Sequence, residues 1–348
     1  MPGDLLLAEI REQPHALARL LEHEAEIVEL AETIAARSPA VVRLVGHGTS
    51  DNAASYGVYA FGILAGWTAF RDSISLSVYY DAQIDMSDSV VIALSQSGQT
   101  PDVLEYVERA RARGAFTVAL TNEPESELAS SAAAVVPLSA GAERSVAATK
   151  TYVNALAALA LLAAGAAGRG AELGEGLRRT VDLLEGSLDT LQSAVPAIAV
   201  PMAFVGRMFV IGRGLEFATA REVALKLTET CRVAAEPLTA TDLAHGPVAA
   251  LDSLFPVWTI ASPGETLPAV VEAAARAREA GATIVASGSA ADAIEGASYA
   301  LPVPEAPNPE LAPLLSVLPG QLFAWALAQA KGLDPDKPHG LSKVTLAR

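Results

Sequence analysis

The chain has 348 residues, 51% of them apolar, and a formal net charge of −16. This length exceeds what one small core needs and suits two domains of ordinary size. The acidic balance argues against a nucleic-acid partner, because phosphate backbones are bound by basic surfaces. An anionic small ligand would therefore have to be held by local dipoles and a few placed cations.

The sequence shows no signal for export or for a membrane. Its N-terminus lacks the basic region of a signal peptide. The longest apolar run, 153–167, is interrupted by Asn154 and is Ala-rich, which favours a buried helix over a membrane span. The single cysteine, Cys231, excludes an internal disulfide and a cysteine-based metal site. We expect a soluble cytoplasmic protein with no membrane partner and no metal.

Helices are expected at 5–37, and Pro14 lies inside the first of these helices or breaks it. The rest of the chain consists of two similar halves. An apolar strand ending in a Gly-rich turn is followed by a second strand that leads through a polar turn into a helix. A third strand and a short apolar run close each half. The matched segments are 42–50 with 209–216, 90–100 with 257–266, 116–120 with 283–286, and 134–138 with 299–303. Their nearly constant spacing indicates a duplicated unit.

Continuous apolar strands that alternate with amphipathic helices are typical of parallel sheets covered on both faces. We therefore predict two tandem doubly wound three-layer α/β/α domains, which bind ligands at the carboxyl ends of their strands. The expected parts are N-terminal helices at 1–37, a first domain at 38–178, a helical connector at 179–200, a second domain at 201–332 and a C-terminal tail at 333–348.

The segment 95–100 (SQSGQT) ends a buried strand and opens a helix at 101–111. Hydroxyls, amides and a glycine gather where the free N–H groups and the positive end of the helix dipole favour an anion. The alternative is a plain N-cap, but a cap needs only one such side chain. The segment is therefore interpreted as a phosphate loop, and only the first copy is expected to bind phosphate.

The turn at 46–50 (GHGTS) contains a G-x-G pair, which is weak evidence for a dinucleotide site. The third glycine of that fingerprint is missing, so a small-ligand turn formed by Gly48, Thr49 and Ser50 is the better interpretation. His47 either faces the ligand or has a structural role.

Glu222, Lys226 and Glu229 lie at i, i+4 and i+7 of an expected helix, which places them on one face. A solvated stripe of salt bridges is one interpretation. The other is proton transfer at carbon, because burial can raise the pKa of a glutamate toward neutrality. The residues alone leave both open, and they favour a structural role for His245 and a surface position for Lys343.

The segments LSQSGQT, SVAATK, GRGLEFATAREVALKLTET, LAHGP and GLSKVT together resemble the double-SIS-domain sugar-phosphate isomerases. The resemblance is greatest to the isomerase half of glutamine–fructose-6-phosphate amidotransferase and to free-standing relatives such as glucosamine-6-phosphate deaminases. The glutaminase half is absent from the sequence, so glutamine-dependent synthesis is not expected. The resemblance implies a cofactor-free homodimer with shared active sites.

The resemblance also implies residue roles. Glu229 would move the proton between C1 and C2, with Lys226 and Glu222 beside it. His245, from a neighbouring subunit, would open the sugar ring, and Lys343 would form an imine with an open ketose. The implied substrate contacts are Ser95, Gln96, Ser97 and Thr100 for the phosphate and Thr49, Ser50, Val146 and Ala148 for the sugar.

The expected reaction is isomerisation of an amino-sugar 6-phosphate with loss of ammonia. The alternative is elimination of water from an N-acetylamino-sugar 6-phosphate by the same base, and a less favoured one is a non-catalytic phosphosugar sensor. The sequence departs from the synthase pattern at His47, which replaces Cys, at Ala148, which replaces Ser, and at Pro237. These departures bear on the sugar and its C2 substituent rather than on the phosphate.

Overall fold

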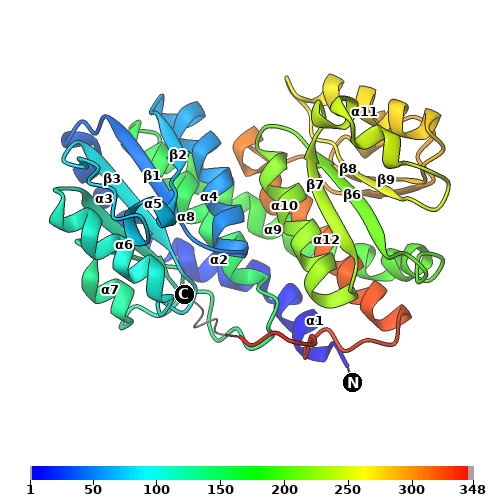
Figure 1. Cartoon of the computed structure of the whole chain (residues 1–348), viewed down its shortest axis with the longest axis horizontal. Coiled ribbons are helices and arrows are strands. Elements are labelled where there is room, and N and C mark those ends of the chain that lie inside the picture. The colour runs from blue at the N-terminus through cyan, green and yellow to red at the C-terminus, as the bar shows by residue number, and fades with distance from the viewer. Residues whose placement is uncertain (1, 344–348) are drawn as a thin grey trace. The chain divides into compact units, whose positions relative to one another are not determined.

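A computed structural model describes residues 2–343 of the chain, which divide into two compact units. The first-sheet unit comprises His15–Glu143, Lys150–Arg178 and 342–343. The second-sheet unit comprises 2–14, Arg144–Thr149 and Arg179–Leu341. Each unit contains one parallel sheet of five strands (Figure 1).

The sheet of the first-sheet unit has the order β2-β1-β3-β4-β5. Its central strand β3 is buried along its whole length, as expected for a parallel sheet with both faces covered. The three-residue edge strand β2 was not predicted. The strands are β1 (Val41–Val45), β2 (Ala69–Arg71), β3 (Ser89–Leu94), β4 (Phe116–Thr121) and β5 (Ala134–Pro137).

The sheet of the second-sheet unit has the same order when its strands are matched in sequence, β7-β6-β8-β9-β10. Val42 pairs with Val90 between β1 and β3, and Val210 pairs with Trp258 between β6 and β8. The predicted duplication into two doubly wound domains is therefore confirmed. The strands are β6 (Arg207–Gly212), β7 (Ala234–Thr239), β8 (Val257–Ile260), β9 (Ile284–Gly288) and β10 (Tyr299–Pro302).

Strand β7, which was also missed, explains the unusual Pro237. Among residues 2–343, the strand pairs only with β6, and it lies at the edge of its sheet. Proline has no N–H to donate, so it is tolerated in a strand whose outer side has no partner.

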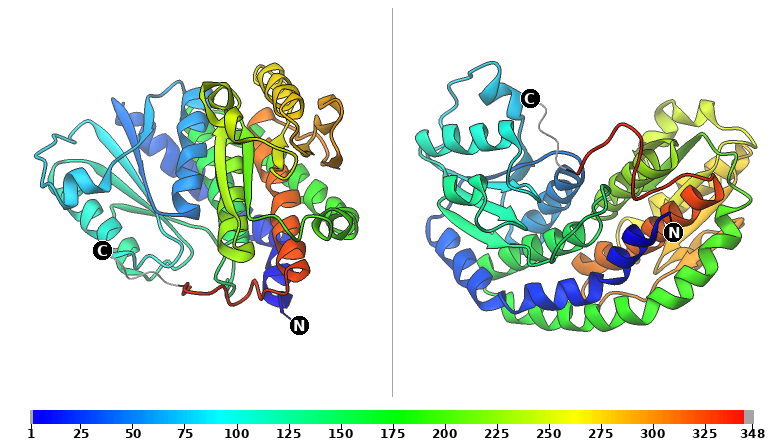
Figure 2. Two further views of the ribbon diagram at one scale, coloured as in Figure 1. Left: turned by 45° about the vertical axis from the view of Figure 1, so that its right-hand side comes forward. Right: turned by 90° about the horizontal axis from the view of Figure 1, so that it is seen from below.

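Helices cover both faces of the first sheet (Figure 2). On one face, Val91 and Ala93 of β3 pack in a core cluster with Val103 and Tyr106 of α6. The predicted buried helix at 153–167 is confirmed as α8, which is buried along almost its whole length. The helices are α3 (Glu24–Ala36), α4 (Thr49–Ala60) with the π-helical turn η1 (Phe61–Ala65), α5 (Ile74–Val78), α6 (Pro101–Ala112), α7 (Glu127–Ser131) and α8 (Lys150–Ala166).

The second sheet is covered by α10 and α12 and by α11, and α12 also contacts α1. Helix α12 is long and apolar enough to cross a membrane, but 94% of that window is buried, as in a core helix. Pro14 lies in the first turn of α2, where a missing N–H costs nothing. The remaining helices are α1 (Asp4–Arg11), α2 (Gln13–Leu21), α9 (Gly170–Ala199), α10 (Glu216–Cys231), α11 (Leu267–Glu279) and α12 (Ala312–Ala330), with short 3-10 turns η2 (Asp242–His245), η3 (Pro247–Ala250), η4 (Ala291–Ala293) and η5 (Pro309–Leu311).

A buried carboxyl group fills the turn after β6. Glu216 begins α10, and its side chain accepts hydrogen bonds from the hydroxyls of Ser262 (2.5 Å), Thr219 (2.6 Å) and Ser316 (2.8 Å). Burial raises the pKa of Glu216 above its ordinary value of 4.5, although the three hydroxyl groups act in the opposite direction. The folded state therefore favours the protonated carboxyl.

This buried carboxyl predicts a pH dependence of stability. As the pH rises above 4.5, the unfolded chain releases the proton before the folded chain does, so the free energy of unfolding falls until the folded carboxyl also ionises. Glu216→Gln removes the part of the pH dependence that comes from this carboxyl group. In urea denaturation, the stability of the variant relative to the native chain should increase as the pH rises above 4.5.

The matched control is Glu265→Gln, because Glu265 is exposed in the neighbouring turn. This variant should leave the pH dependence unchanged. A Glu216→Gln difference that stays constant or shrinks with rising pH would contradict the assignment of a protonated buried carboxyl.

Candidate functional site

The phosphate loop lies between β3 and α6, as predicted. Thr100 occupies the N-cap position of α6, but its side chain caps no backbone N–H. Its hydroxyl lies 3.0 Å from the hydroxyl of Ser95 instead. The plain N-cap interpretation is therefore wrong for Thr100, and the N-terminus of the helix is not closed by this side chain.

Gly98 fixes the path of the loop. Its φ of +60° favours glycine, and a Cβ at this position would lie 2.0 Å from the Oγ of Ser126. The carbonyl of Gly98 accepts from Leu128 N and that of Gln96 from Asn122 N, both at 3.1 Å. These carbonyl oxygens point toward the segment after β4, so they are not available to repel an anion at the loop.

The turn at 46–50 is linked to the helix that follows the phosphate loop. His47 Nε2 lies 2.8 Å from Asp102 Oδ2 in the first turn of α6. The imidazole is 55% exposed, whereas the Asp102 side chain is 9% exposed. Gly48 is the N-cap residue of α4, and Thr49 and Ser50 are its first, partly buried residues.

The structure therefore brings the two predicted turns of the first-sheet unit together through His47 and Asp102. Asp102 was not predicted from the sequence. Its only signal is an acidic residue in the first turn of a helix, which is common at helix N-termini for dipole reasons alone.

The helical face of Glu222, Lys226 and Glu229 is buried. Lys226 Nζ lies 3.3 Å from Glu222 Oε1 and 2.6 Å from Glu229 Oε2. The side chains of Glu222 and Lys226 are 0% and 1% exposed, and that of Glu229 is 21% exposed. The solvated-stripe interpretation is therefore wrong. We refer to these residues as the buried triad.

Lys226 is held in its charged form. Desolvation lowers the pKa of Lys226, but the charges and hydrogen bonds of Glu222 and Glu229 outweigh it, and the pKa lies above its ordinary value. A cation therefore lies against Glu229, the most accessible member of the triad. Such a cation can stabilise negative charge that develops beside that carboxylate.

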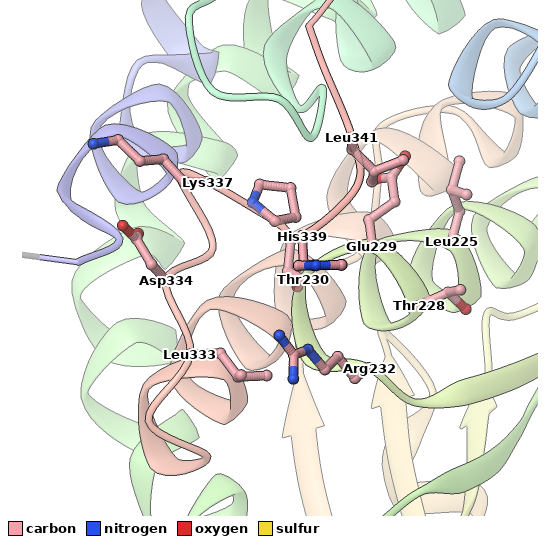
Figure 3. Close-up of a pocket in the computed structure, with 11 residues that line it drawn as sticks. Leu225, Thr228, Glu229, Thr230, Arg232, Leu333, Asp334, Lys337, His339 and Leu341 are labelled. Carbon is pink, nitrogen blue, oxygen red and sulfur yellow. The ribbon is translucent and has the colours of Figure 1, made fainter.

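A pocket of about 750 Å³ adjoins Glu229 within the second-sheet unit. Figure 3 shows Arg232 and His339 over the end of α10, whereas the amine of Lys337 points away. The pocket is lined by the end of α10 and by the following residues of the C-terminal segment: Leu333, Asp334, Lys337, Pro338, His339 and Leu341. Solvent and small molecules can therefore reach the side chain of Glu229. Among residues 2–343, no cluster of His, Cys, Asp and Glu side chains could hold a metal ion.

The predicted sugar-lining residues Val146 and Ala148 are partly buried in the segment Arg144–Thr149. The carboxylate of Glu9, 5% exposed, accepts hydrogen bonds from the backbone N–H groups of Arg144 and Ser145 and so fixes the start of this segment. Glu9 was not found in the sequence because its partner lies more than 130 positions away in the chain.

The two remaining candidates differ in their surroundings. His245 ends the 3-10 turn η2, is exposed, and forms no side-chain hydrogen bond or ion pair within the described part of the chain. A satisfied structural histidine is therefore the wrong interpretation. Lys343 forms an ion pair of 3.0 Å with the buried carboxylate of Glu143, so it is not a free surface lysine.

Comparison with known proteins agrees with this architecture. The SIS domain family model matches residues 39–165 and 203–330. A glutamine–fructose-6-phosphate aminotransferase (isomerizing) from Gloeobacter violaceus is 36% identical over 312 residues, which cover 87% of this chain and 51% of that protein. One from Aeropyrum pernix is also 36% identical, over 97% of this chain and 56% of that protein. The chain thus spans about half the length of the curated relatives it matches.

Solved structures show the same fold. The C-terminal domain of glucosamine-fructose-6-phosphate aminotransferase from Francisella tularensis superposes with a TM-score of 0.89 at 26% identity, covering 96% of this chain and 98% of that one. A glucosamine-6-phosphate deaminase from Thermotoga maritima shares the fold alone, with a TM-score of 0.74 at 20% identity over 95% of this chain and 99% of that one. Because one family model matches both halves of the chain, the chain belongs to the SIS domain family.

Proposed function

We propose that the chain is an enzyme that converts an amino-sugar 6-phosphate, with glucosamine 6-phosphate as the type substrate, to a ketose 6-phosphate and ammonia. The observation that carries the proposal is the buried triad on α10. A lysine fixed in its charged form between two carboxylates, one of which lines a pocket, suits proton transfer next to a carbonyl carbon.

The phosphate loop would bind the phosphate group. Hydroxyls of Ser95, Ser97 and Thr100 and the N-terminus of α6 offer donors without a counter-charge. The close packing of Gly98 against Ser126 keeps these donors in place before a ligand arrives. The loop thereby fixes one end of the sugar phosphate, which lowers the entropic cost of placing the reacting carbons.

The reaction begins when the sugar ring opens to its aldehyde, a step that we assign to His245. Glu229 then removes the proton from C2 and returns a proton to C1, while the charge of Lys226 stabilises the intermediate. The nitrogen at C2 becomes an imine, and water adds to that carbon. Ammonia leaves as the ketone forms, so one water is consumed for each ammonia released.

The exposure of His245 supports this assignment, because an imidazole without a protein partner can exchange protons with a ligand. We propose that the protein acts as a homodimer and that this histidine serves the site of a neighbouring subunit. A dimer also accounts for an otherwise solvent-exposed catalytic group.

The proposed base can be tested with Glu229→Gln. Loss of the carboxylate should lower kcat for ammonia release from glucosamine 6-phosphate by a factor of about 10²–10⁴, because a positioned general base contributes that much. Binding of the substrate, measured by calorimetry, should change little because the phosphate loop is untouched. Ammonia is measured with a coupled assay.

Glu272→Gln is the matched control, since Glu272 is an exposed glutamate on α11 paired only with Arg276 among the described residues. Unchanged turnover in Glu229→Gln would remove Glu229 from its role. Loss of water without ammonia from an N-acetylated substrate, detected by mass spectrometry, would favour elimination over deamination. Phosphosugar binding without any turnover would favour a sensor.

The triad also predicts a stability effect. Lys226→Met leaves two carboxylates in a site where Lys226 is 1% exposed, so we expect the free energy of unfolding to fall by about 3–5 kcal/mol near neutral pH. Urea denaturation of the variant and the native chain at the same pH measures the effect.

Arg276→Gln provides the control, because it breaks a glutamate–arginine pair of the same i, i+4 spacing that is exposed on α11. It should cost less than about 1 kcal/mol. Equal effects of the two variants would mean that the triad is solvated after all.

A further inference from the structure

Lys343 forms an ion pair with the buried carboxylate of Glu143. Lys343 Nζ donates to Glu143 Oε2 at 3.0 Å, across 200 positions of sequence. The Glu143 side chain is fully buried, whereas 22% of the Lys343 side chain remains accessible. The anion of this pair is therefore fixed inside the first-sheet unit, and the lysine keeps one open side.

Glu143 is itself held at the start of α8. Its two oxygens accept hydrogen bonds from the backbone N–H (3.2 Å) and the hydroxyl (2.8 Å) of Thr151. Lys150 Nζ, which is also buried, donates to the carbonyl of Ala142 at 2.9 Å and fixes the backbone next to Glu143. Since Glu143 Oε2 is the atom that also meets Lys343, these contacts define where the amine of Lys343 can lie.

A lysine side chain has four rotatable bonds, so its amine can occupy many positions. A reactive amine therefore needs a partner that sets its position. A buried carboxylate is suited to this because it cannot move and because removing its cation would leave an uncompensated charge.

Resting on the proposed function, we propose that Glu143 is the positioning residue for Lys343. It fixes the amine of Lys343 where this amine meets the open sugar phosphate. Glu143 itself does not contact the substrate. The amine of Lys343 adds to the carbonyl carbon of the ketose product, water leaves, and an imine forms. The amount of this imine reports whether Lys343 is correctly placed.

The experiment compares the native chain with Glu143→Gln, Glu143→Asp and the matched control Glu172→Gln. The control removes a glutamate that pairs with Arg169 on the surface of the same unit. Trace acetylation of Lys343 is measured by mass spectrometry relative to Lys337, a lysine without an ionic partner in the described chain. Kinetics with glucosamine 6-phosphate and borohydride trapping with fructose 6-phosphate complete the set.

In Glu143→Gln we expect Lys343 to be acetylated about fivefold or more faster than in the native chain, and we expect less imine to be trapped with fructose 6-phosphate. Glu143→Asp, which keeps the charge but retracts it, should lie between the native chain and Glu143→Gln. The aspartate variant decides the matter if the glutamine variant does not fold. Glu172→Gln should match the native chain.

Native rates of acetylation of Lys343 and native imine trapping in the folded Glu143 variants would overturn the proposal. A fall in stability with unchanged acetylation of Lys343 and unchanged imine trapping would also overturn it, because it would mean a merely structural role. If the native chain itself neither turns over nor forms an imine, the proposed function fails. The acetylation rates still report on the pairing of Glu143 with Lys343 in that case.

Discussion

The lysine at position 226 lies almost without solvent contact between two carboxylates of its own helix. Burying three charges is costly, and the arrangement persists because each charge has an opposite partner within 3.3 Å. Most of the helix around them is packed into the core of the second-sheet unit, against α12 and the sheet. The accessible part of Glu229 therefore meets the pocket with a fixed cation behind it, and the proposed chemistry depends on this constraint.

The two copies of the fold have diverged at the same turns. In the first copy, the segment after β3 keeps its hydroxyls and its helix N-terminus for an anion. In the second copy, the corresponding turn contains Ser262, whose hydroxyl donates a hydrogen bond to the carboxyl group of Glu216. This carboxyl group occupies the space after β6. An internal carboxyl thus takes the hydroxyl that a ligand would need, which supports the expectation that only the first copy binds phosphate.

Periodicity and repetition in the sequence predicted most of the fold, because long apolar strands and amphipathic helices are local patterns. The edge strands β2 and β7 were missed. One has three residues, and the other contains Pro237, so neither has a strong local signal. The spacing of Glu222, Lys226 and Glu229 predicted one face but not its burial, which depends on α12 nearly a hundred positions later.

The contacts that position the candidate residues could not be predicted for the same reason. Asp102, Glu9 and Glu143 look like ordinary acidic residues in the sequence. Their partners are 55, 135 and 200 positions away and are brought near only by the folded chain. The motifs therefore predicted candidate residues for the chemistry, whereas the structure was needed to find the side chains that contact them.

The central claim is that Glu229 moves a proton between adjacent carbons of a sugar phosphate. Turnover of glucosamine 6-phosphate in deuterated water, followed by NMR, tests it most directly. A proton held on a partly accessible carboxylate exchanges with solvent, so the account predicts deuterium at C1 of the ketose product and none after Glu229→Gln. Equal incorporation of deuterium at C1 by Glu229→Gln, together with an unchanged rate of ammonia release, would contradict the account.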